Sequence, residues 1–385
     1  MPTDFDHIHE TANRGAAAIL DELVEQLRSQ KKYHELFEAL KMSARQKLDL
    51  PLLYGDSLDE LDEGVREKLE DGLLAACREV GMLLLADGKI REGWMYLRPV
   101  GDRAAVAREL ATMEATPEQT DELVEVCLHE GVDVRRGYQL VLQNYGTCNA
   151  ITTYESALAR HARADQQAAA ELLVKHVHAE LLHSVKTDIA RQEGSQPNAS
   201  TLQDLVSERD WLFGEYSYHI DTTHLASTVR IARIVDDPEV LKLVLDMTHY
   251  GRRLAKQFQY KGEEPFAEIY PSHALFVSAI LGQQVEAALT YFREKTETLS
   301  AAEHGSAPVE IYVQLLERLG RYDEAMKTLM QFADQEQRPK QIVPLLMELS
   351  RKLGDYRTVT EFCRRHDDLL GYSTALAHQQ QLTSS

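Results

Sequence analysis

Apolar residues recur at spacings of three and four along the chain from about residue 15, which is the period of an amphipathic α-helix. No stretch alternates apolar and polar positions as a half-buried β-strand does. The first predicted hairpin pairs a helix within 16–30 with a helix within 31–48, and Pro51 interrupts the pattern after it. The pattern therefore predicts an all-α protein made of consecutive helical hairpins.

Two segments in the first half of the chain, 72–112 and 118–160, look like copies of one hairpin offset by 43 to 44 residues. In each copy a glycine ends the first helix, and a second glycine and an aromatic residue stand early in the next helix. Glycine tolerates the left-handed conformation at a helix end, and a small residue lets two helices approach closely. The matching positions are Gly88 and Gly131, Gly93 and Gly137, and Trp94 and Tyr138.

A second repeat lies in 309–366, where a G-x-Y-x-x-A pattern between two amphipathic helices recurs after 34 residues. The matching positions are Gly320 and Gly354, Tyr322 and Tyr356, and Ala325 and Val359. This pattern resembles the tetratricopeptide repeat family, although Val359 replaces the usual alanine. The resemblance implies an α-solenoid of helix-turn-helix repeats that binds a protein or peptide, and it does not identify the partner because such repeats serve many binding functions.

The sequence predicts four regions. Residues 1–160 form N-terminal helical-hairpin repeats, and residues 161–272 form an irregular helical segment rich in histidine and aromatic residues. Residues 273–376 form the repeats that resemble the tetratricopeptide family, and residues 377–385 form a disordered tail. The predicted fold is thus an all-α solenoid whose regular repeats flank an irregular centre.

The central segment carries a candidate metal site between His176 and His224. Carboxylate-x-x-His occurs twice there, ending at His183 and at His224. In di-iron helical bundles this spacing lets one helical turn supply an oxygen and a nitrogen ligand to the same centre, so a divalent Fe, Zn or Mn ion is one cofactor to consider. The alternative is that the histidines lie at the edge of helix packing and hydrogen-bond carboxylates or carbonyls. If its segment is helical, His219 lies one turn after Glu215. Asp221 is equally suited to be the N-cap of the helix that follows it. The candidate ligands are His176, Glu180, His183, His219, Asp221 and His224.

Aromatic and basic residues in the same region form a second candidate site. The aromatic residues are either a ligand-binding surface or a wall buried under a loop, and the arginines either hold an anion or make ordinary helix salt bridges. The candidates are Trp211, Tyr218, Tyr260, Tyr270, Arg230, Arg233, Arg252 and Arg253.

Charge and composition reduce the number of functions that the protein could have. The net charge of −20, from 42 basic and 62 acidic side chains, argues against binding to nucleic acid or to an anionic membrane. The four cysteines form no C-x-x-C pair, the acidic start has no apolar run, and no apolar stretch is long enough to insert into a membrane. We therefore expect a cytoplasmic scaffold or adaptor that binds a peptide or protein partner, with a metal-dependent enzyme as the alternative.

Overall fold

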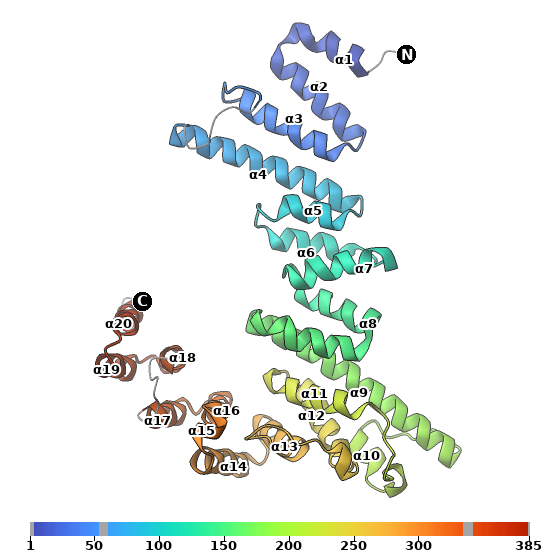
Figure 1. Ribbon diagram of the computed structural model, residues 1–385, viewed down its shortest axis with the longest axis vertical. Coiled ribbons are helices and arrows are strands. Elements are labelled where there is room, and N and C mark those ends of the chain that lie inside the picture. Colours follow the sequence, from blue (N-terminus) through green and yellow to red (C-terminus); the bar gives the residue numbers. More distant parts are fainter. Residues whose placement is uncertain (1–3, 54–60, 334–341, 384–385) are drawn as a thin grey trace. The chain divides into compact units, whose positions relative to one another are not determined.

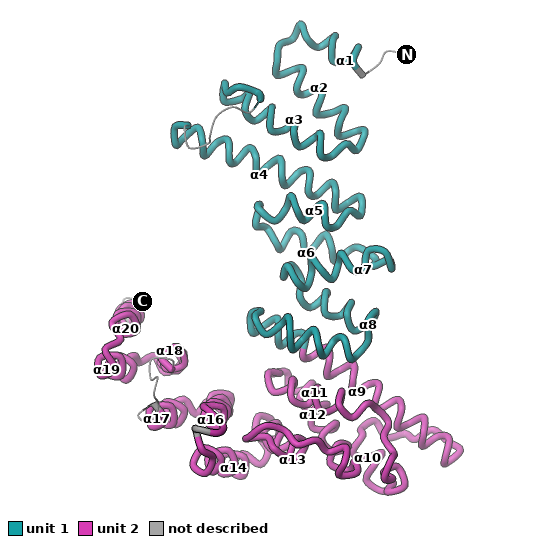
Figure 2. The backbone as a smooth tube through the Cα atoms, viewed as in Figure 1, with its two compact units in different colours: residues 1–169 teal, residues 170–385 magenta. Residues whose placement is uncertain are grey.

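The structure is a computed structural model that describes residues 4–53, 61–333 and 342–383 (Figure 1). Within these residues every regular element is helical, and the remaining pairing is a single antiparallel bridge between Lys261 and Glu268. The all-α prediction is therefore confirmed. The chain divides into two compact units at Ala169–Ala170, shown in separate colours in Figure 2. No helix among the described residues has both the length and the apolar composition needed to cross a lipid bilayer.

Unit 1, up to Ala169, is a stack in which consecutive helices pack on one another. Its core includes Leu36 from the third helix and Val80 and Leu84 from the fourth, all with no exposed surface. The helices are α1 (Asp4–Thr11), α2 (Ala16–Ser29), α3 (Tyr33–Gln46), α4 (Glu63–Ala86), α5 (Ile90–Leu97), α6 (Arg103–Thr112), α7 (Pro117–Val124) and α8 (Val134–Ser156), with short turns of other helix types at Ala12–Arg14, Glu125–His129 and Leu158–Arg160.

The predicted repeat in unit 1 is confirmed by its glycines. Gly88 and Gly131 take positive φ angles of 77° and 71° where each hairpin turns, a conformation that favours glycine. A Cβ atom added at Gly93 would lie 2.8 Å from the side chain of Leu85, and one added at Gly137 would lie 2.7 Å from Leu128. Helices at both crossings are thus too close for any larger residue.

Unit 2, from Ala170, contains the irregular centre and the C-terminal repeats. The helix α9 (Arg163–Glu193) includes the boundary between the units. The helices that follow are α10 (Leu202–Val206), α11 (Thr222–Ile231), α12 (Pro238–Gly251), α13 (Ile269–Ile280), α14 (Val285–Thr298), α15 (Ala301–His304), α16 (Ala307–Arg318), α17 (Tyr322–Ala333), α18 (Val343–Leu353), α19 (Arg357–Arg365) and α20 (Leu369–Thr383), with 3-10 turns at Asp210–Leu212, Ala232–Ile234 and Lys256–Phe258.

The 34-residue repeat corresponds to the hairpins α16–α17 and α18–α19. Gly320 and Gly354 take φ angles of 72° and 69° at the two turns. Ala325 and Val359 are fully buried at equivalent positions of one continuous core. The structure thus confirms a helical repeat here, while membership of the tetratricopeptide family stays a prediction.

Two local predictions differ from the structure. The predicted tail at 377–385 is helical as far as Thr383, within α20, and 384–385 lie outside the described residues. The segment that holds Glu215 and His219 is not helical, so these side chains are not one helical turn apart. Gly214 and two exposed tyrosines give this segment little apolar periodicity, so no helix face could be buried there.

Burial of Ala325 gives a direct test of the repeat. We expect Ala325→Trp to overpack the α16–α17 crossing and to lower the free energy of unfolding by about 1–3 kcal/mol. Lys327→Trp on the same helix is the matched control, because Lys327 is exposed. Chemical denaturation monitored by circular dichroism measures both variants. Equal stabilities would contradict the placement of Ala325 in the core.

Candidate functional site

A buried contact between a histidine and a carboxylate fixes the framework of the irregular centre. The Nε2 atom of His178 on α9 lies 2.7 Å from an Oδ2 oxygen of Asp246 on α12, and both side chains are about nine-tenths buried. The same carboxylate accepts hydrogen bonds from the backbone N–H groups of Leu202 and Gln203, each at 2.8 Å. Asp246 thereby joins α9, α12 and the start of α10 at one point.

The surroundings of Asp246 keep it ionised. Burial by itself raises the pKa of this carboxyl, but the hydrogen bonds from His178 and from the N–H groups of Leu202 and Gln203 lower it more. The net pKa of Asp246 therefore lies below its ordinary value. A buried carboxylate with three donors is satisfied, whereas the same group without them would carry a large desolvation cost.

A second polar network holds the segment between α10 and α11. The backbone N–H of His219 donates to the Tyr250 hydroxyl at 3.0 Å, and His219 Nδ1 lies 2.9 Å from the same oxygen. Its Nε2 lies 3.2 Å from Asp188 Oδ2 on α9. We assign the proton of the neutral ring to Nε2, because the carboxylate of Asp188 can only accept, and Nδ1 then accepts from the Tyr250 hydroxyl.

The network supports residues 213–220, which we call the tyrosine loop. Its side chains Tyr216 and Tyr218 are 75% and 54% exposed, and the neighbouring Trp211 is 42% exposed. Gln257 donates to the backbone carbonyl of Glu215 at 2.6 Å. The ring of Tyr218 packs edge-on against Phe258, with the ring centroids 5.1 Å apart. The backbone of the loop is therefore held by contacts with the rest of the protein, while Tyr216 and Tyr218 are exposed to solvent.

A surface hollow of about 500 Å³ lies between the tyrosine loop and α9. It offers hydroxyl groups, two imidazoles and both signs of charge beside two tyrosine rings. Side chains of this mixture make the hydrogen bonds and the apolar contacts that a peptide segment requires. The lining residues are His183, Ser184, Thr187, Asp188 and Arg191 on α9, and Tyr216, Ser217, Tyr218 and His219 in the loop.

The predicted metal ligands do not converge on one point in unit 2, although His183 and His219 line the same hollow. On α9, His176 Nε2 lies 3.5 Å from Glu180, and His183 lines the hollow. His219 contacts Asp188 and Tyr250, as described above. Asp221 caps α11 by accepting from the N–H groups of Thr223 and His224 at 2.8 and 3.3 Å, which confirms its alternative assignment as an N-cap. Across the described parts of the chain, no three histidine, cysteine or acidic side chains converge as a metal site requires.

The four candidate arginines have different contacts. The guanidinium of Arg253 pairs with Asp210 and lies over the ring of Phe213, 4.8 Å from its centroid. Arg233 lies 4.9 Å from the centroid of Phe266, and Arg230 donates to the Ser227 hydroxyl on its own helix. Arg252, at the end of α12, is exposed. The ion pair of Arg253 holds the turn that carries Trp211.

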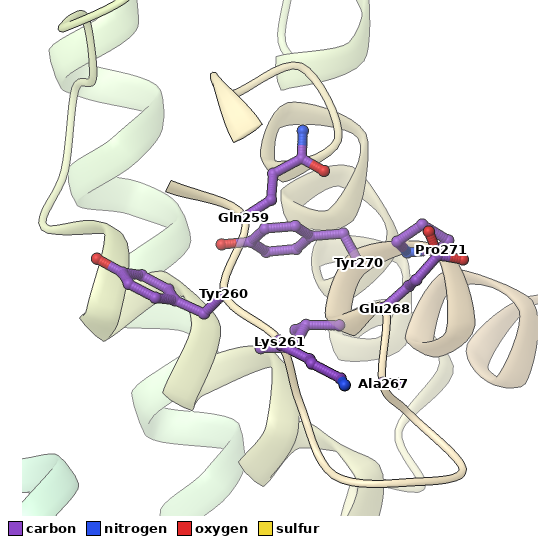
Figure 3. A pocket seen from close by; sticks show the side chains of 8 residues that line it. Gln259, Tyr260, Lys261, Ala267, Glu268, Tyr270 and Pro271 are labelled. Carbon is purple, nitrogen blue, oxygen red and sulfur yellow. The ribbon is translucent and has the colours of Figure 1, made fainter. Parts of the chain in front are cut away.

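The candidate aromatic residues divide into two groups. Trp211 and Tyr218 are exposed at the tyrosine loop, whereas Tyr270 is buried in α13. The Tyr260 hydroxyl lies 2.9 Å from the Thr222 hydroxyl at the start of α11. Tyr260 and Tyr270 line a second cavity (Figure 3), which is separate from the hollow beside α9.

Sequence reasoning missed His178, Asp246, Asp188 and Tyr250. One signal was present for Asp246, because it interrupts the apolar face of α12 between Val244 and Met247, and a charged residue there requires a buried partner. The partner itself could not be identified, since it lies 68 positions away in the chain.

Comparison with known proteins does not assign the chain to a family. No protein-family model and no curated protein matches it. A solved structure described as a "circular tandem repeat protein with novel repeat topology and enhanced subunit contact surfaces" aligns with 94% of this chain and 82% of its own, at 16% identity and a TM-score of 0.18.

The lowered pKa of the buried Asp246 carboxylate predicts a specific pH dependence. A carboxyl whose folded-state pKa lies below its ordinary value of about 3.9 stabilises the fold above that pH, and the contribution is lost as the pH falls through the folded-state pKa. We expect Asp246→Asn to lower the free energy of unfolding by about 3–5 kcal/mol at pH 7, because His178 loses its buried partner. The difference from wild type should shrink below about pH 4.

Urea denaturation at a series of pH values measures this difference. Glu180→Gln on α9 is the control, because Glu180 is exposed, and we expect it to follow the wild type at every pH. A difference between Asp246→Asn and wild type that stays constant from neutral to acid pH would contradict the assignment.

Metal removal tests the remaining alternative for the histidines. Because no three of the predicted ligands converge, we expect excess chelator to leave the melting temperature of the wild type unchanged. We also expect the effects of His183→Ala and His224→Ala to add in the double variant, as changes at independent sites do. If a chelator instead lowers the melting temperature of the wild type but not that of either single variant, the result would show that His183 and His224 bind a metal ion.

Proposed function

We propose that this helical-repeat protein is a scaffold or adaptor that binds a peptide segment of a protein partner in the hollow between the tyrosine loop and α9. The observation that carries the proposal is the exposure of Tyr216 and Tyr218 on a loop that hydrogen bonds hold to the protein, with Trp211 exposed beside it. Tyrosine and tryptophan are enriched where proteins bind one another, because each combines a large apolar ring with a hydrogen-bonding group.

Because the loop is already held in place, binding a partner costs less conformational entropy. His219 is bonded to both Tyr250 and Asp188, so the backbone between the two tyrosines and α11 is held before any partner arrives. Binding to a preformed surface avoids the cost of ordering a flexible loop, which is about 0.5–1.5 kcal/mol for each side chain that becomes immobile. The hollow of about 500 Å³ suits a short extended segment with one or two inserted side chains.

The repeat family, the type of partner and the cellular location are part of the same proposal. The hairpins in 309–366 fit tetratricopeptide-like repeats, because both copies place a glycine at the turn and a small or β-branched residue at the crossing. The net charge of −20 favours a protein or peptide partner over nucleic acid. We further propose a cytoplasmic location, in agreement with four free cysteines.

Peptide display tests the proposed site. We would select 12-residue random peptides on the immobilised full chain, without depletion on the Tyr216→Ala/Tyr218→Ala variant. Selected peptides, synthesised with a fluorophore, are titrated by fluorescence anisotropy. We expect the double variant to bind them at least about tenfold more weakly, because exposed aromatic anchors carry most of the energy of such interfaces.

Phe5→Ala provides the matched control, because Phe5 is 84% exposed on α1 and lies in unit 1, outside the proposed site. Its affinity for the peptides should equal that of the wild type. Selected peptides that bind equally well to the double tyrosine variant would place the binding surface elsewhere.

A further inference from the structure

The last described helix, α20, carries a row of exposed leucines. Leu369 and Leu370 are 77% and 80% exposed, and Leu376 is 41% exposed. At about 100° per residue these leucines lie with Ser373 and Ala377, which are also exposed, within about 120° of arc on one side of the helix. We call this side the outer face of α20. No other described part of the chain covers it, and an exposed apolar surface of this kind is typical of an interaction site.

The other side of α20 is attached to α19, beside which it lies in Figure 1. Ala375 has no exposed surface and belongs to the core of the C-terminal repeats. The side-chain oxygen of Gln379 accepts a hydrogen bond from the backbone N–H of Tyr356 at 3.0 Å, and Arg364 donates to the Tyr372 hydroxyl at 2.7 Å. These contacts fix the rotation of α20, so the way the helix packs is what leaves its leucines exposed.

The charge of α20 sets it apart from the rest of the surface. The helix contains no aspartate, glutamate, lysine or arginine. Among the described α-helices only α13 shares this property, and every residue of α13 is buried or half-buried. Residues 343–383 contain five basic and five acidic side chains, so the net charge of −20 arises elsewhere in the chain. Two copies of the chain therefore repel each other over most of their surface, but not at α20.

We propose that the outer face of α20 binds the same face of a second copy of the chain, which gives a two-fold symmetric dimer. In a two-fold contact each surface meets its own copy, so a charged residue near the axis would meet a like charge. The outer face has no such residue. Its leucines lie beside the small side chains of Ser373 and Ala377, which leave space for the leucines of the opposite copy. One helix from each copy makes a small interface, so we expect a dissociation constant in the micromolar range.

The composition of α20 does not suit a lipid surface. Helices that lie on membranes carry lysine or arginine on their polar side, where these residues attract anionic lipids. The polar residues of α20 are serine, threonine, glutamine, tyrosine and one histidine. A second copy is therefore the occupant that the uncharged helix favours. The proposal does not depend on peptide binding at the tyrosine loop, because no residue of α20 lines that hollow.

Analytical ultracentrifugation of the full chain over a dilution series tests the proposal. We expect the wild type to approach twice the mass of one chain, which is 43.6 kDa, and to dissociate on dilution. Leu370→Glu/Leu376→Glu should associate at least about tenfold more weakly, because the contact would bury like charges against each other. Leu53→Glu/Leu74→Glu is the matched control in unit 1, where these leucines are 78% and 39% exposed. It should associate as the wild type does, and circular dichroism should give the same melting temperature for both variants.

Cross-linking tests the symmetry of the contact. Ser373 lies in the middle of the outer face, so a two-fold contact centred there brings the two Ser373 residues together. We expect Ser373→Cys to be joined across the dimer by a short bis-maleimide. Lys327→Cys, at an exposed position of α17, is the control and should not be joined. Both variants carry Cys148→Ser as well, because Cys148 is the exposed native cysteine.

Three results would overturn the proposal. The first is a wild type that stays monomeric at every concentration. The second is a dimer that Leu370→Glu/Leu376→Glu retains with unchanged affinity. The third is equal cross-linking of Ser373→Cys and Lys327→Cys. Monomers that float with phosphatidylcholine vesicles would assign the outer face to lipid instead.

Discussion

The buried hydrogen bond between His178 and Asp246 is the interaction on which the centre of unit 2 depends. Three structural elements meet at the Asp246 carboxylate, because it accepts from His178 on α9 and from the two N–H groups that begin α10. The regular hairpins need no buried polar contact of this kind, because their apolar faces alone align the helices. The centre is irregular, and a buried charge tolerates only the arrangement that supplies all its donors. The pair therefore specifies one position for α10 and α12 against α9.

The tyrosine loop depends indirectly on the packing of α12 against α9. Tyr250 is on α12 and Asp188 is on α9, and His219 bonds to both. A shift of α12 along α9 would break one of these contacts and release the loop. The same helix ends at Gly251, whose lack of a side chain admits the ring of Tyr270. The position of α12 thus controls both the hollow beside α9 and the cavity beside α13.

The repeats on either side follow a simpler rule. A hairpin cannot bury its apolar face alone, so each one is stabilised by the next. Gly93, Gly137 and Ala325 stand where two helices cross, and their small size sets the distance between those helices. Gly88 and Gly320 turn the chain where a positive φ is needed. A local pattern of small and apolar residues is enough to build such a fold, which is why its period is visible in the sequence.

The sequence by itself determined the all-α class, the hairpins and the positions that turn and cross in each repeat, because these follow from contacts between residues close in the chain. It also indicated that 176–224 is unusual, and it left Asp221 open between a metal ligand and a helix cap. It did not show which polar residues meet. His178 and Asp246 lie 68 positions apart, and His219 lies 31 positions from both Asp188 and Tyr250. Only tertiary packing brings them together, because buried charges select partners by geometry and desolvation, which no local pattern encodes.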